Sequence, residues 1–160
     1  MTDFTHLDEK GRAKMVDVTA KESTVREAVA QGKVLMDPNT VTAIEQGEMP
    51  KGDVFSVARI AGIMAAKKTS EIVPMCHPLE LTGINIDFSS SIEKGEINIK
   101  ASVKTVGKTG VEMEAMTAVS AAALAIYDMC KSADRGIILS DIKLLTKSGG
   151  KSGTFVRQKE

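Results

Sequence analysis

The chain has 160 residues, of which 42% are hydrophobic and 26% charged, values that are ordinary for one globular domain and exclude disordered, collagen-like and coiled-coil chains. Lysine plus arginine number 21 and aspartate plus glutamate number 21, so no net charge attracts nucleic acid or an acidic membrane. Only 3% of the residues are aromatic, which disfavours a surface that stacks single-stranded RNA.

The first 35 residues predict an arm followed by strands. Residues 1–14 are polar and charged and contain no apolar run typical of an export signal, so we expect a mobile arm there. Residues 15–18 fit a short edge strand. The apolar residues between 25 and 35 fit either a strand with a bulge at Gly32 or a short helix, and we adopt the strand.

Two helices are predicted next, each introduced by an aspartate that can cap its first backbone N–H groups. The first follows Asp37 and runs from 38 to 46, with a proline at its first position and a glycine after its end. The second follows Asp53 and runs from 54 to about 68. Its predicted buried face consists of five apolar residues at helical spacing: Val54, Val57, Ile60, Ala61 and Met64.

A loop bracketed by prolines then leads into the clearest strand pattern of the chain. Pro74 and Pro78 favour an extended backbone between them. Apolar and polar residues alternate from 84 to 88 and again from 97 to 103, with a Glu-Lys-Gly turn between the two runs. This period of two, interrupted by a glycine turn, predicts an antiparallel hairpin.

The last third of the chain predicts a long helix and two strands. The helix extends from 111 to about 133, and Gly136 ends it. A strand at 142–146 follows, then a loop rich in glycine and serine at 148–153 and a short final strand within 154–157.

In chain order, these elements read β-α-β-β-α-β with one extra short helix, which is the order of the ferredoxin-like, or split βαβ, fold. We therefore predict an α+β domain over residues 15–157, in which the helices cover one face of an antiparallel sheet. We find no linker and no repeated unit in the sequence, so we expect a single domain.

Charged residues gather at both ends of the predicted long helix. Glu112 and Glu114 stand in its first turn, while Asp128 and Lys131 stand near its end, roughly 21 Å away by helix rise. Their position on a helix is enough to explain them, because carboxylates favour a helix N-terminus and Asp128–Lys131 is an ordinary i,i+3 pair.

The other helix carries a lysine at each end. Because the two helices of a ferredoxin-like fold run antiparallel, Lys51 should lie at the Asp128 end of the long helix. Lys67 and His77 should then lie at the Glu112 end. Either set can do acid–base chemistry, and neighbouring lysines lower one another's pKa. A solvated surface charge is the ordinary alternative for each lysine.

Two glycine–lysine loops resemble the end of a phosphate-binding loop. They are residues 107–110 and 149–153. Neither is a Walker A motif, because Ser102 and Leu145 stand where that motif needs glycine. Backbone N–H groups in such loops can still hold an anion, but turn geometry explains the glycines equally well.

The cysteines and histidines do not predict a metal site. Cys76 and His77 are adjacent, and adjacent ligands rarely chelate one ion well. Two cysteines are too few for a disulfide framework, so we expect a reduced, cytoplasmic protein. The most apolar stretch, residues 116–127, is too short to span a membrane.

Five motifs stand in this chain in one order: Lys51–Phe55, Pro74–Pro78, Gly107–Ala115, Ile126–Lys131 and Lys147–Gly153. Together they closely resemble the cyclic pyranopterin monophosphate synthase family, also called molybdenum cofactor biosynthesis protein C or MoaC. The resemblance extends from about Thr5 to Val156. Met75 stands where many members carry leucine, a mild change for a loop.

The resemblance implies an enzyme that acts early in molybdenum cofactor biosynthesis. The implied substrate is a cyclised dihydro-GTP, 3′,8-cyclo-7,8-dihydro-GTP, and the products are cyclic pyranopterin monophosphate and pyrophosphate. A hydroxyl attacks the α-phosphate to close a cyclic phosphate, and no redox change is needed. The sequence has no cysteine set for an iron–sulfur cluster and requires no cofactor, although Mg²⁺ can accompany the triphosphate.

The resemblance also implies roles for individual residues. Lys51, Asp128 and Lys131 are the expected catalytic residues, which transfer protons if burial and mutual repulsion lower the pKa of a lysine. Substrate contacts are expected from Met75, Cys76, His77, Met113, Glu114 and Glu112, and the triphosphate is expected to bind Lys67, His77 and Lys147.

The two residue sets lie too far apart on one chain for a small substrate to bridge them. We therefore expect an active site at a subunit interface, with Lys51, Asp128 and Lys131 from one chain and His77, Glu112 and Glu114 from another. The family resemblance implies a homo-oligomer, namely a hexamer built as a trimer of dimers, with neither a nucleic-acid nor a membrane partner.

A non-catalytic ferredoxin-like module that senses a nucleotide is the alternative function. The order of the elements and the lysine-bearing loops support it, but such a module needs no acid–base set beside its anion site. An RNA-binding domain with the same order is disfavoured, because Phe88 is the only aromatic ring on the hairpin strands.

Overall fold

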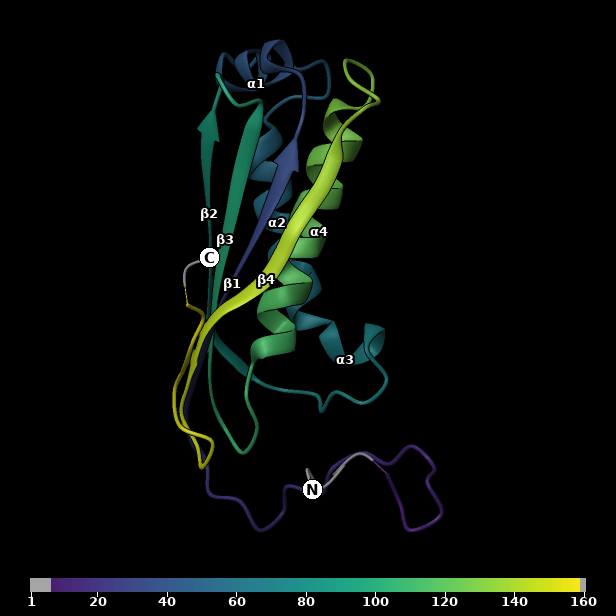
Figure 1. Cartoon of the computed structure of the whole chain (residues 1–160), viewed down its shortest axis with the longest axis vertical. Helices are drawn as coiled ribbons and strands as arrows, with labels where there is room; N and C mark the ends of the chain where they lie inside the picture. The colour runs from purple at the N-terminus through teal and green to yellow at the C-terminus, as the bar shows by residue number, and fades with distance from the viewer. Residues whose placement is uncertain (1–6, 159–160) are drawn as a thin grey trace.

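The structure, a computed structural model, describes residues 7–158. Five strands form one antiparallel sheet in the order β2-β3-β1-β4-β5, and helices α2 and α4 lie side by side against one face of it (Figure 1). This arrangement confirms the predicted ferredoxin-like fold. The elements in chain order are β1 (Thr24–Leu35), α1 (Pro38–Glu45), α2 (Val54–Lys67), α3 (Thr69–Ile72), β2 (Leu81–Ser91), β3 (Glu96–Gly107), α4 (Glu112–Cys130), β4 (Ile138–Ser148) and β5 (Phe155–Val156).

Strand β1 lies at the centre of the sheet and confirms the choice of a strand over a helix. It pairs with β3 on one side and with β4 on the other. Its core-facing row is made of small residues, and Ala28 and Ala30 are fully buried. A Cβ built on Gly32 would lie only 2.5 Å from Val119 Cγ1 of α4. The glycine therefore lets the long helix pack close to the sheet.

The bulge expected at Gly32 exists, but its extra residue belongs to β4. The register between β1 and β4 shifts twice, once between Val29 and Ala30 and once between Gln31 and Lys33. At each shift β4 contains one more residue than the stretch of β1 that it faces. Asp141, in the second of these bulges, has a φ of 52°, in the left-handed region. Bulges of this kind increase the local twist of a strand, so β4 bends as it passes β1.

The predicted buried face of α2 is wrong for its larger residues. Val54 is buried, but Val57, Ile60 and Met64 are 42%, 58% and 55% exposed. The buried face instead presents small residues four positions apart, Ala58, Gly62 and Ala66. Small residues allow α2 to approach α4 closely, so the bulky side chains turn outward. We call this exposed row, Val57, Ile60 and Met64, the α2 stripe.

Several boundaries also differ from those predicted. Residues 15–18 form no strand. Helix α3 was not predicted, because four residues are too few to show a helical period. Strand β4 is longer than the predicted 142–146, since β1 offers it a long partner. The predicted first helix, hairpin and final strand are confirmed by α1, β2–β3 and β5.

Helix α4 forms the centre of the hydrophobic core. Within residues 7–158 it is the one helix whose length and composition would suffice to cross a membrane, but half of that segment is buried inside the fold. It packs on α2 and on strands β1, β3 and β4. It ends at Cys130, earlier than the predicted 133, because the chain turns there toward β4. It begins near α3 and ends at the end of the domain that holds α1, so its two ends lie far apart (Figure 1).

Replacing Gly62 with alanine is expected to destabilise the fold by about 1–3 kcal/mol, although alanine is intrinsically favoured over glycine in a helix by about 1 kcal/mol. A Cβ at this position would collide with Ile86 Cδ1 and would lie 2.9 Å from the carbonyl oxygen of Ala118. Urea unfolding at a fixed protein concentration measures the change.

Gly83→Ala is the matched control for this substitution, because the nearest atom to its new Cβ, Lys104 Cβ, would be 3.8 Å away. If Gly62→Ala is as stable as the unmodified protein, or no less stable than Gly83→Ala, then the two helices do not pack as closely as described.

Candidate functional site

A carboxylate held between two lysines occupies one end of the helix layer. Lys51 precedes α2, and its Nζ lies 2.8 Å from Asp128 Oδ2, in the last turn of α4. Lys131 Nζ lies 2.8 Å from the other oxygen, Oδ1. Lys51 also donates to the main-chain oxygen of Asp128 at 2.8 Å. The antiparallel helices therefore bring these three residues together, as predicted. We call them the Asp128 cluster.

The Asp128 cluster is exposed and strongly coupled. Hydrogen bonds from Lys131 and then from Lys51 lower the pKa of Asp128 to about 2. The same bond raises the pKa of Lys131 above its ordinary value. This direction is opposite to the one expected from repulsion between lysines, because the hydrogen bond and the charge of Asp128 outweigh the effect of burial on the amine. In this arrangement Lys131 is protonated and can act as an acid.

Glu112 lies at the opposite end of α4 and forms an ion pair with Lys147. The Nζ of Lys147, near the end of β4, lies 3.0 Å from Glu112 Oε1 and 3.3 Å from Ser152 Oγ. The structure thus joins the start of α4 to the loop that follows β4, and two residues of the predicted substrate-binding set meet there.

Glu114 points into the interior beside the loop that carries Cys76. It is only 4% exposed, and burial raises the pKa of its carboxyl group. Burial, and next the nearby Glu114, raise the pKa of the Cys76 thiol. Cys76 is therefore a poor nucleophile at neutral pH, and its predicted role as a contact residue is the one its environment suits.

His77 is tied to the segment that precedes β1. Its Nε2 lies 2.8 Å from the carbonyl oxygen of Val16, so Nε2 carries the proton and donates it. The remaining members of the predicted set differ in exposure: Met75 is half-buried in the same loop, Met113 is exposed on α4 and Lys67 is exposed in the last turn of α2.

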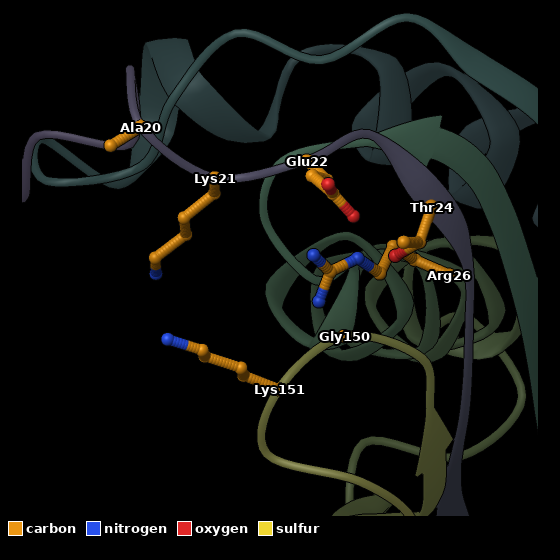
Figure 2. Close-up of a pocket in the computed structure, with 7 residues that line it drawn as sticks. All are labelled: Ala20, Lys21, Glu22, Thr24, Arg26, Gly150 and Lys151. Atoms are coloured by element: carbon orange, nitrogen blue, oxygen red, sulfur yellow. The ribbon is translucent and has the colours of Figure 1, made fainter.

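A cleft of about 580 Å³ opens between the segment before β1 and the second glycine–lysine loop, residues 149–153. Figure 2 shows Lys21 and Lys151 extending from two facing segments toward each other, with the guanidinium of Arg26 to one side of their amines. A smaller cleft next to it is lined in part by Lys108 and Lys147. Together these clefts hold five cations, Lys21, Arg26, Lys108, Lys147 and Lys151, against three carboxylates, Glu22, Glu27 and Glu112.

We call these two neighbouring clefts together the cationic cleft. Most of its cations were not predicted from the sequence. The loops were recognised, but Lys21 lies in irregular chain and Arg26 lies in a strand. One signal was available for Arg26. It occupies the same alternating row as Ala28 and Ala30, which faces the core, and a charged residue in such a row is unusual.

Metal-ligating side chains do not gather in the described part of the chain. Within residues 7–158, no group of three or more histidine, cysteine, aspartate or glutamate residues is placed to hold an ion. Both cysteines are free thiols.

The two predicted sets remain separate on one chain. Glu112 begins α4 and Asp128 lies in its last turn, roughly 24 Å apart by helix rise. Figure 1 shows α4 running along the domain between them. A single copy therefore presents an acid–base cluster at one end and a cationic cleft at the other.

The Asp128 carboxyl group is expected to titrate with a pKa of about 2 in carboxyl-detected NMR. Because this pKa lies below the ordinary value of 3.8, the ion pairs stabilise the fold above about pH 4 and lose that effect as the pH falls toward 2. Lys131→Met should raise the pKa of Asp128 toward 3.8 and leave the pKa of Asp53, which is lowered by Ser56, unchanged. An unchanged Asp128 titration in this variant would contradict the described pairing.

Comparison with known proteins gives one consistent result. A profile of the MoaC family matches residues 15–150. A protein of Pelotomaculum thermopropionicum named cyclic pyranopterin monophosphate synthase is 58% identical over 160 residues, which cover 100% of this chain and 94% of the relative. Proteins of the same name from Roseiflexus sp. and Clostridium acetobutylicum are 58% and 56% identical, over 98% and 96% of this chain and 99% and 96% of their own lengths. This chain belongs to the MoaC family.

Proposed function

We propose that this chain converts 3′,8-cyclo-7,8-dihydro-GTP into cyclic pyranopterin monophosphate and pyrophosphate, an early step of molybdenum cofactor biosynthesis. Its curated relatives carry the name of the enzyme that makes this product. The structural observation that carries the proposal is the Asp128 cluster, in which one carboxylate contacts two amines at 2.8 Å. The rebuilding of a purine into a pterin needs several proton transfers, and such a cluster can supply them.

Within the Asp128 cluster, Lys131 begins as the proton donor. Its pKa is raised by the bond to Asp128, so its amine is charged at neutral pH. Substrate that separates Lys131 from Asp128 would return the pKa of this lysine toward its ordinary value. Lys51 donates to the same carboxylate and to the main-chain carbonyl of Asp128, so Asp128 stays ionised and fixes the positions of both amines.

The cationic cleft is the proposed site of the triphosphate. Amines and a guanidinium form strong charge-assisted hydrogen bonds with phosphate oxygens. Lys147 belongs both to this cleft and to the set expected to bind triphosphate, whose other members are His77 and Lys67. Held there, the α-phosphate can be attacked by the substrate hydroxyl while pyrophosphate leaves. Mg²⁺ can accompany the phosphates but is not required by this proposal.

A second copy of the chain completes the proposed site. The α2 stripe and Leu124 on α4, which is 60% exposed, make the outer surface of the helix layer apolar. A two-fold axis across this layer would bury these side chains and bring the Asp128 end of one chain to the Glu112 end of the other. We propose a homo-oligomer built from such dimers, a hexamer in the complete assembly, located in the cytoplasm.

Purified protein incubated with 3′,8-cyclo-7,8-dihydro-GTP is expected to release pyrophosphate and the cyclic pterin phosphate. Lys51→Ala and Lys131→Ala should reduce the rate by at least about 100-fold, the typical contribution of a general acid or base, while substrate still binds. Lys100→Ala, which removes an exposed lysine from β3, is the control and should keep full activity. If substrate binds but is recovered unchanged from the unmodified protein, the nucleotide-sensing alternative replaces the enzyme.

Complementation tests whether two chains share the site. Lys131→Ala and Glu112→Ala should each be inactive when refolded alone. A refolded equal mixture should recover about a quarter of full activity, because half of the dimers are mixed and each mixed dimer has one intact site of two. A mixture that stays inactive, although the two variants assemble together, would place the whole site on one chain.

A further inference from the structure

Arg26 carries a charge into the core-facing row of β1. It is 8% exposed and stands opposite Thr105 of β3, at the end of the sheet that borders both clefts. Burying a guanidinium is costly unless its N–H groups are hydrogen-bonded. None of the ion pairs formed within residues 7–158 includes Arg26.

Main-chain carbonyls of two loops take the place of a counter-ion. Arg26 Nε donates to the oxygen of Gly107 at 3.2 Å, and Nη2 donates to the oxygen of Lys108 at 3.3 Å. Nη1 donates to the oxygen of Gly149 at 3.2 Å. One planar group therefore connects the loop before α4 to the loop after β4, although the two loops are about 40 residues apart in the chain.

The second loop is shaped around this guanidinium. Gly149 and Gly150 have φ values of 98° and 74°, in the region that favours glycine. A Cβ on Gly150 would collide with Arg26 Nη1. A Cβ on Gly149 would collide first with the main-chain oxygen of Val25 and would also lie 3.0 Å from Arg26 Cδ. The paired glycines thus leave room for the side chain as well as for the turn.

We propose that Arg26 is a positioning residue that clamps the two glycine–lysine loops together and so sets where their lysines stand for the phosphate groups of the substrate. Lys108 lies in the first loop, while Lys147 and Lys151 flank the glycine pair of the second. The inference rests on the proposed function only in naming the substrate. The clamp should affect the affinity for any linear polyphosphate, including inorganic triphosphate.

Geometry rather than charge is the decisive property in this proposal. A guanidinium presents N–H groups in a rigid fork that reaches three carbonyls at once. A lysine keeps the positive charge but carries one compact ammonium on a flexible stem, so it cannot hold both loops in the same way. Arg26→Lys should therefore behave like Arg26→Gln.

The test measures binding of inorganic triphosphate by calorimetry and steady-state kinetics with the cyclised dihydro-GTP. Arg26→Gln and Arg26→Lys should each weaken triphosphate binding about tenfold and raise KM by a similar factor. We expect kcat to stay within about threefold, because Arg26 donates to main-chain carbonyls of the two loops and to no member of the Asp128 cluster. Gly150→Ala, which pushes the guanidinium aside without removing it, should reproduce these changes.

Gly47→Ala is the matched control, because this glycine also has a positive φ of 70°, has no atom within 4 Å of its new Cβ and lies in the turn after α1, outside both loops. It should leave KM and triphosphate affinity unchanged. If Arg26→Lys restores full affinity, charge rather than clamping is responsible and the inference fails. It also fails if Gly150→Ala and Gly47→Ala behave alike.

Gly150→Ala keeps the experiment decisive if the Arg26 variants melt below the assay temperature. The calorimetric measurement of triphosphate binding tests this inference independently of the proposed function. If the unmodified protein forms no product but the Arg26 variants bind triphosphate more weakly than it does, the clamp is supported and the enzyme assignment is contradicted. If the Arg26 variants keep full activity and an unaltered KM, the clamp alone is overturned.

Discussion

The close packing of α2 on α4 is the constraint on which the rest of the structure depends. Gly62 meets α4 where a larger residue would collide with the carbonyl oxygen of Ala118. The two helices lie side by side against the sheet. Lys51, just before α2, therefore reaches Asp128 in the last turn of α4. The same packing turns the larger side chains of α2 outward, so one contact sets both the acid–base cluster and the exposed apolar surface.

The two charged regions of the molecule differ in their physical character. The Asp128 cluster is exposed, and exposed ion pairs contribute little to stability, so its principal consequence is the protonation state of its members. Arg26 is buried, and its hydrogen bonds are part of what holds the sheet end together. The first arrangement suits groups that exchange protons. The second suits a scaffold that must keep several lysines in fixed positions.

The proximity of Lys51, Asp128 and Lys131 could be predicted because these residues mark the ends of helices. Asp128 and Lys131 belong to one helix end, and the antiparallel order of the fold brings Lys51 to them. The role of Arg26 could not be predicted in this way. Its partners lie in two loops that are distant in the sequence, and a period of two in a strand shows only that its side chain faces inward. The direction of the pKa shift at Lys131 also needed the structure, because it depends on which neighbour lies closest.

Local patterns in the sequence determined the order of elements, the hairpin, the capped helices and hence the ferredoxin-like class, because turns, caps and periodicity act between near neighbours. The motifs also placed the chain among the synthases of its family. Only the tertiary structure decided which face of α2 is buried, since Val57, Ile60 and Met64 fit a helical period as well as Ala58, Gly62 and Ala66 do. Helical periodicity identifies a row of residues, but the space left by the facing helix determines which row can enter the core.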